Sequence, residues 1–151
     1  MSIQILKNTH QEAVIKVWGA AGVTETIDIS TLLATGQALD GATQTVTITG
    51  VSWSGATNGI VTVSRSTATI MTLQANAAGM LYFEGQTMPP DSVQATADIA
   101  VAITGAACEC WLKLRKVSGY ATMIEDATYG AYDDPTRVGA STTKSGSPDK
   151  V

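Results

Sequence analysis

Charge is scarce in this sequence of 151 residues. Asp, Glu, Lys and Arg make up 15% of it, against about a quarter in typical soluble domains. Aromatic residues reach only 5%, so a core has to come mainly from the aliphatic part of the 44% apolar fraction. Surface charge normally opposes association. The composition therefore fits either a single well-packed domain coated with Thr and Ser, or a protein whose surface is partly covered by partners.

Catalytic and metal-binding residues are also few. No motif places a Ser, a Cys or a second carboxylate beside the only histidine, His10, so we expect a solvated loop histidine and no enzyme. Cys108 and Cys110 are separated by one residue, which on a strand puts both side chains on one face. We expect reduced, buried thiols there, and the alternative is half of a metal site completed in an oligomer. No cofactor is expected.

Signals for nucleic acid, membrane insertion or secretion are missing. The net charge of −4 argues against a primary role on nucleic acid, where Lys and Arg dominate affinity. No apolar run reaches about 18 residues, and the first residues lack the basic and apolar regions of a signal peptide. We therefore expect the protein to remain in the compartment where it is made. Lys113 and Arg115 share one strand face, which fits edge protection or an interfacial role.

What the sequence does contain is alternation of apolar and polar residues, with many β-branched side chains. Asn58-Gly59 predicts a hairpin turn, and Gly50 inside a strand predicts a bulge or kink. Only residues 30–39 fit a helical turn. The pattern predicts an all-β fold, an antiparallel β-sandwich or jelly roll, over residues 1–120. The predicted strands cover residues 12–18, 23–29, 45–53, 60–65, 67–73, 80–84, 97–103 and 108–117.

The three tryptophans are Trp18, Trp53 and Trp111. Exposed tryptophans on a sandwich can stack on sugars, so a carbohydrate- or receptor-binding module is one hypothesis. Their sequence neighbours are apolar strand residues, and burial is the commoner outcome for such residues. We expect all three to be largely buried in the core or an interface.

Residues 121–151 differ in character from the rest of the chain. They are polar and rich in Gly, Ser, Thr and Pro, a composition that cannot support a core. We predict an extended arm that becomes ordered on a neighbouring subunit. Its expected partner-binding residues are the anchors Tyr129 and Tyr132, with Asp133, Asp134 and Arg137 fixing the register at the rim.

Two segments together resemble a known protein class. Residues 5–17, ILKNTHQEAVIKV, and residues 112–120, LKLRKVSGY, are similar to parts of small virion structural proteins of tailed, T4-like marine bacteriophages. The resemblance implies a non-enzymatic virion protein assembled in the host cytoplasm, most simply a capsid decoration or cement protein. A neck, tail or baseplate protein is the alternative within this class. The implied partners are other virion proteins, such as the major capsid protein or neck and tail subunits, and further copies of the chain in a homo-oligomer.

Overall fold

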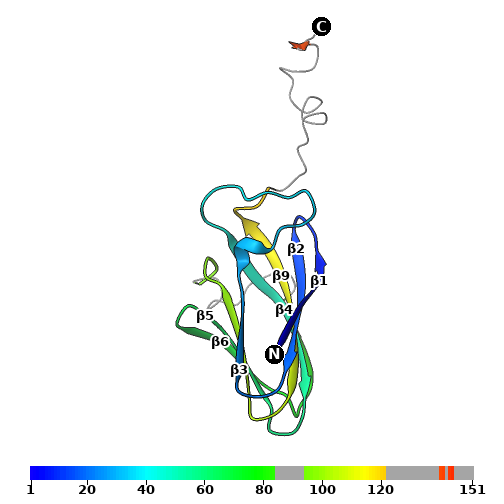
Figure 1. Ribbon diagram of the computed structural model, residues 1–151, viewed down its shortest axis with the longest axis vertical. Coiled ribbons are helices and arrows are strands. Elements are labelled where there is room, and N and C mark those ends of the chain that lie inside the picture. The colour runs from blue at the N-terminus through cyan, green and yellow to red at the C-terminus, as the bar shows by residue number, and fades with distance from the viewer. Residues whose placement is uncertain (84–93, 122–139, 142, 145–151) are drawn as a thin grey trace.

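The computed structural model describes residues 1–83, 94–121, 140–141 and 143–144, and the described part contains strands and one short 3-10 turn, with no α-helix. Figure 1 shows the strands stacked in two layers. The elements are β1 (Ser2–Asn8), β2 (Glu12–Gly19), β3 (Val23–Ile27), the 3-10 turn η1 (Ile29–Thr31), β4 (Thr45–Gly55), β5 (Ile60–Arg65), β6 (Ala68–Gln74), β7 (Gly79–Tyr82), β8 (Ile99–Thr104), β9 (Cys108–Ser118), β10 (Ala140–Ser141) and β11 (Thr143–Lys144).

Two antiparallel sheets form a β-sandwich, which confirms the predicted fold class. One sheet has the strand order β1-β2-β9-β4-β7, and the other has the order β3-β8-β5-β6. Every pairing within them is antiparallel. The strands β9 and β4, with 11 residues each, are the longest of the first sheet and pair with each other (Figure 1). A further two-stranded pairing joins β10 to β11.

The alternation of the sequence places the core between the sheets. In β8, Ile99, Val101 and Ile103 are fully buried, while the residues between them are partly exposed. In β9, Cys110 and Leu112 are buried in the same way. Because successive side chains on a strand point to opposite faces, each sheet turns one aliphatic face inward. The core is therefore built from Val, Ile and Leu, as the scarcity of aromatic residues requires.

The predicted kink at Gly50 is present as a bulge in β4. Ile48 pairs with Leu114 and Gly50 with Lys113, so Thr49 is an extra residue in the ladder. The extra residue reverses the alternation. Ile48 is buried before the bulge and Val51 after it, and Gly50 comes to lie on the outer face of the sheet.

The strand predictions fail mainly at the chain's beginning and at the ends of elements. The first strand, β1, was not predicted, and its residues from Ser2 to Lys7 are all exposed. The strand predicted over residues 23–29 stops at Ile27, because the Asp28 side chain accepts a hydrogen bond from the Ser30 amide and starts η1. That short turn is the only helical structure found within residues 30–39, all of which are described.

Arg65 ties the two sheets together at one end of the sandwich. Its side chain is fully buried. The guanidinium donates to the carbonyl of Val46 in the opposite sheet, at 2.6 Å, and to those of Ala95 and Ala97, at 2.8 and 2.7 Å. Arginine suits this position because its fixed fork of donors can satisfy several carbonyls at once.

Candidate interaction face

The outer surface of the five-stranded sheet is the most unusual feature of the described chain. Along β9, Cys110, Leu112 and Leu114 face the core, so the residues between them face outward. We call this surface the lysine–aromatic face. Its residues are Lys7, Glu12, Val14, Lys16, Trp18, Gly50, Ser52, Met80, Tyr82, Glu109, Trp111, Lys113 and Arg115.

Strand register brings these residues together in rows that cross the sheet. In one row, Lys16 of β2 pairs with Trp111 of β9, which pairs with Ser52 of β4, and Ser52 pairs with Met80 of β7. The next row contains Lys7, Val14, Lys113, Gly50 and Tyr82 in that order. Directly opposed side chains in antiparallel strands lie about 4.5–5.5 Å apart at Cβ, close enough to interact. Each row therefore places a lysine beside an aromatic ring.

Lys16 lies between two tryptophans. Its ammonium nitrogen is 4.9 Å from the ring centre of Trp18 and 5.6 Å from that of Trp111. Glu109 fixes Lys16 and Trp111 relative to each other, because its carboxylate accepts a hydrogen bond from the Trp111 indole at 2.8 Å and lies 3.9 Å from the Lys16 ammonium. A cation over the electron-rich face of an indole is attracted by the ring quadrupole. The four side chains form one ordered cluster.

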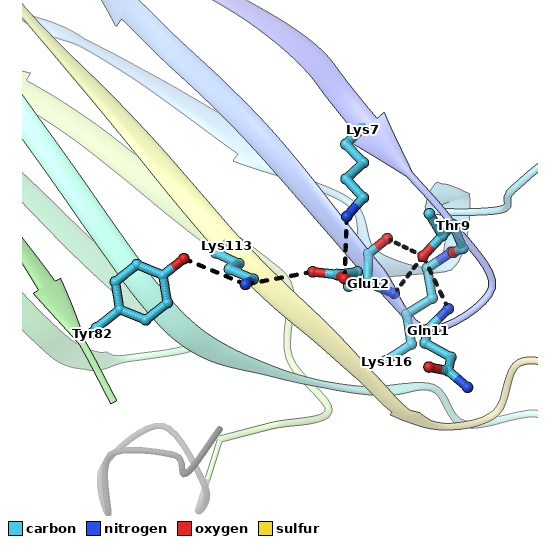
Figure 2. A network of polar contacts seen from close by, with 7 residues as sticks. All are labelled: Lys7, Thr9, Gln11, Glu12, Tyr82, Lys113 and Lys116. Carbon is cyan, nitrogen blue, oxygen red and sulfur yellow. Dashed lines mark hydrogen bonds and ion pairs between the residues drawn. The ribbon is translucent and has the colours of Figure 1, made fainter. Parts of the chain in front are cut away.

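Lys113 makes a second cluster in the neighbouring row (Figure 2). Its ammonium lies 5.2 Å from the Tyr82 ring centre, donates to the Tyr82 hydroxyl at 3.4 Å and is 3.7 Å from a Glu12 oxygen. The other Glu12 oxygen accepts from Lys7 at 3.2 Å. The hydrogen bond and charge interaction with Tyr82, and then the Glu12 charge, raise the pKa of Lys113. This lysine therefore remains a cation.

A hollow of about 180 Å³ opens where Gly50 contributes no side chain. We call it the Gly50 hollow, and a second recess of about 230 Å³ adjoins it beside Arg115 and Glu12. Both are open depressions on the lysine–aromatic face. The walls of the Gly50 hollow include Val14, Met80, Tyr82, Trp111 and Lys113.

Large apolar side chains are exposed on this face. Met80 is 67% exposed, Tyr82 58% and Trp111 39%. Trp111 is therefore not a core residue, and Trp18 is only half-buried on the same face, so the expected burial of these two tryptophans in an interface stays a prediction. Trp53 packs against the core and donates its indole proton to the Gln74 carbonyl at 3.0 Å.

The basic pair identified in the sequence belongs to this face. Lys113 and Arg115 do point to the same side of β9, as predicted. The role of edge protection is wrong, because β9 lies in the middle of the sheet between β2 and β4. These cations stand in the centre of a broad surface.

Both cysteines are free and buried on the core side of β9, as expected for reduced thiols. Burial raises the pKa of Cys110 to about 12 and also raises that of Cys108. A buried neutral thiol is a poor nucleophile and a poor metal ligand. Within the described residues, no three His, Cys, Asp or Glu side chains are grouped as a metal site would require.

The histidine is less solvated than expected. His10 lies in the turn between β1 and β2, and its Nε2 atom is buried without a hydrogen-bond partner among the described residues. The His10 carbonyl accepts from the Gln37 side chain at 2.8 Å. The prediction of a solvated loop histidine is wrong for this ring nitrogen.

The expected partner-binding residues Tyr129, Tyr132, Asp133, Asp134 and Arg137 lie outside the described residues. The lysine–aromatic face was missed in the sequence, because Met80, Tyr82 and Lys16 come together only through strand register.

The chain matches no protein-family model and no curated protein sequence. In the part of the chain that is described, no helix is long and apolar enough to cross a membrane.

Proposed function

We propose that this chain is a non-enzymatic virion structural protein, of the capsid decoration or cement type, assembled in the host cytoplasm. The similarity of residues 5–17 and 112–120 to small phage virion proteins supports this class. Both segments contribute to the lysine–aromatic face, through β2 and β9. In this proposal the face attaches the protein to its neighbours in the particle.

The observation that carries the proposal is the exposure of Met80, Tyr82 and Trp111 on one ordered sheet surface. Aromatic residues, Met and Arg are enriched at protein–protein interfaces, and Trp, Tyr and Arg dominate their binding energy. The lysines are already held over the rings, so less side-chain freedom remains to be lost on binding. Such a surface suits a protein partner.

Carbohydrate binding is the second candidate, because Trp18, Trp111 and Tyr82 present aromatic rings on one face. The lysines that cover the aromatic rings argue against carbohydrate binding. Lys16 and Lys113 lie over the surfaces on which a sugar would stack. We expect tryptophan fluorescence to remain unchanged in glycan titrations, and a saturable change would favour the carbohydrate role.

Quantitative mass spectrometry of purified particles of the encoding phage tests the virion role. Hundreds of copies per particle are expected of a decoration protein. A ring of about six or twelve copies would instead place the chain in the neck or tail. Absence of the chain from particles would contradict the proposal.

A further inference from the structure

Charge is unevenly distributed between the lysine–aromatic face and the chain that follows the sandwich. The face carries four cations and two carboxylates, a net charge of +2, although the whole chain has −4. Residues 125–137 carry four acidic residues and one basic residue, a net charge of −3, and include two tyrosines. The two parts are complementary in charge, and both are rich in aromatic residues.

We propose that residues 129–137 of one copy dock on the lysine–aromatic face of a neighbouring copy. In this arrangement Tyr132 fills the Gly50 hollow and the Asp134 carboxylate pairs with Arg115. The inference rests on the proposed function of this face as an assembly surface, and it names the occupant.

The size of the hollow suits one aromatic ring. The Gly50 hollow measures about 180 Å³. An engineered protein cavity of about 150 Å³ takes up benzene. Trp111, Tyr82 and Lys113 line the hollow, so an entering ring would lie beside two aromatic side chains and a cation.

Sequence spacing selects Tyr132 over Tyr129. Asp134 follows Tyr132 by two residues, so both side chains lie on one side of an extended segment, about 6.5–7 Å apart along it. Because proline disfavours the helical region for the residue before it, Pro135 is compatible with an extended docked segment at Asp134. Tyr129 has alanine two residues away in both directions and therefore lacks such a carboxylate.

The face has the matching spacing. Gly50 is the direct cross-strand partner of Lys113, and Arg115 lies two residues further along β9 on the same side. Glu12 and Glu109 already neutralise the lysines of the face. Among the described residues, the Arg115 guanidinium has no hydrogen-bond or ion-pair partner, and it is exposed. It is the cation best placed to receive a carboxylate.

The described chain leaves the sandwich close to the end of β9. The Tyr120 side chain is buried in the core, and its hydroxyl donates to the Ile29 carbonyl. The Ala121 amide donates to Ala38 at 3.0 Å, and its carbonyl accepts from Gln37 at 2.8 Å. These contacts hold residue 121 beside the loop that follows η1, and the same Gln37 amide donates to the His10 carbonyl at 2.8 Å.

Reciprocal charge exchange in the full-length chain tests the pairing by sedimentation velocity. The wild type should associate with rising concentration, and Arg115→Asp and Asp134→Arg should each raise the dissociation constant at least about tenfold, because each creates a like-charge contact. An equimolar mixture of the two variants should recover association, since each supplies a partner for the other. Asp149→Arg, the same charge change outside residues 129–137, should leave association unchanged.

Ring docking is tested separately. Gly50→Val should fill the hollow and weaken association at least about tenfold without lowering the thermal midpoint, since a Cβ there meets its nearest atom at an ordinary 3.4 Å. Tyr132→Ala should weaken association equally, and Tyr129→Ala should not. Tyr132→Ala keeps the test valid if Gly50→Val disturbs the fold.

Three results would overturn the inference: a wild type that stays monomeric up to about 1 mM, single charge variants that associate like wild type, or a mixture that recovers nothing. If the particles contain the chain in any of these cases, the virion role stands and the assigned occupant is wrong. Absence of the chain from particles is the separate result that removes the virion role.

Discussion

Lys116 and Tyr120 are ionisable groups buried near the C-terminal end of β9, and Cys110 is a third one, buried near the start of that strand. Lys116 donates to Asn8, Thr9 and Gln37, each at 2.7 Å, yet burial lowers its pKa from 10.5 to about 8. Burial raises the pKa of Cys110 from 9.0 to about 12 and that of Tyr120 from 10.0 to about 12. These opposite shifts determine how stability depends on pH.

The free energy of unfolding should rise slightly above pH 8 and fall steeply above about pH 10.5. Between 8 and 10.5 the unfolded chain holds the Lys116 proton more tightly than the folded one, so stability increases with pH. Between 9 and 12 the folded chain keeps the Cys110 proton, and between 10 and 12 the Tyr120 proton, so stability is lost. Urea unfolding from pH 7 to 11.5 measures the profile.

Cys110→Ala isolates one contribution to this profile. Each group contributes at most about 1.4 kcal/mol per pH unit to the slope. The variant is less stable near neutral pH because it leaves a small cavity. Its fall above pH 10.5 should nevertheless be shallower than that of the wild type. An equal slope in both proteins would contradict the assigned pKa.

Arg65→Met should lower the free energy of unfolding by about 3–5 kcal/mol, because it removes the donors that satisfy the carbonyls of Val46 in the first sheet and of Ala95 and Ala97 before β8. Arg65→Lys should recover little of this loss, since an ammonium cannot reproduce the planar fork. Chemical unfolding at pH 7 measures both variants. A loss below about 1 kcal/mol for Arg65→Met would show that water replaces the arginine.

Alternation of apolar and polar residues along a strand predicts which side chains face outward. The β9 sequence alternates Cys110, Leu112 and Leu114 with Trp111 and Lys113, so the pattern itself places Trp111 outside. The sequence prediction did not separate the core from an interface for Trp111, because it considered the apolar neighbours of each tryptophan and not which side of the strand its side chain occupies. The contacts of Lys16 with two tryptophans, and of Lys113 with Tyr82, depend on register between strands distant in sequence. Alternation within a strand cannot predict that register.

Alanine substitutions at Gly105 and Gly50 should lower the free energy of unfolding by different amounts. Gly105 connects β8 to β9 with φ +77°, and an added Cβ there meets the Asn58 carbonyl oxygen. We expect Gly105→Ala to cost about 1–3 kcal/mol. Gly50→Ala is the matched control, because its Cβ would have only ordinary contacts, and it should cost less than about 1 kcal/mol. Equal losses in chemical unfolding would contradict the bulge geometry.

The whole molecule combines an aliphatic core with one elaborated outer face. The composition fitted either a well-packed domain coated with Thr and Ser or a protein partly covered by partners, and it could not indicate which surface would be covered. Paired strands place the exposed Met80, Tyr82 and Trp111 beside the ordered lysines on the first sheet. The central claim is that this face is covered in the assembled particle.

Hydroxyl-radical footprinting of purified particles against the isolated chain tests that claim most directly. Met80, Tyr82 and Trp111 should be oxidised readily in the isolated chain, where they are exposed, and strongly protected in the particle. Leu33 and Leu39, exposed in the loop after η1, are the internal references for residues outside the face. Protection of the three face residues beyond that of both leucines is the predicted result. Equal oxidation of Met80, Tyr82 and Trp111 in the particle and the isolated chain would contradict the account.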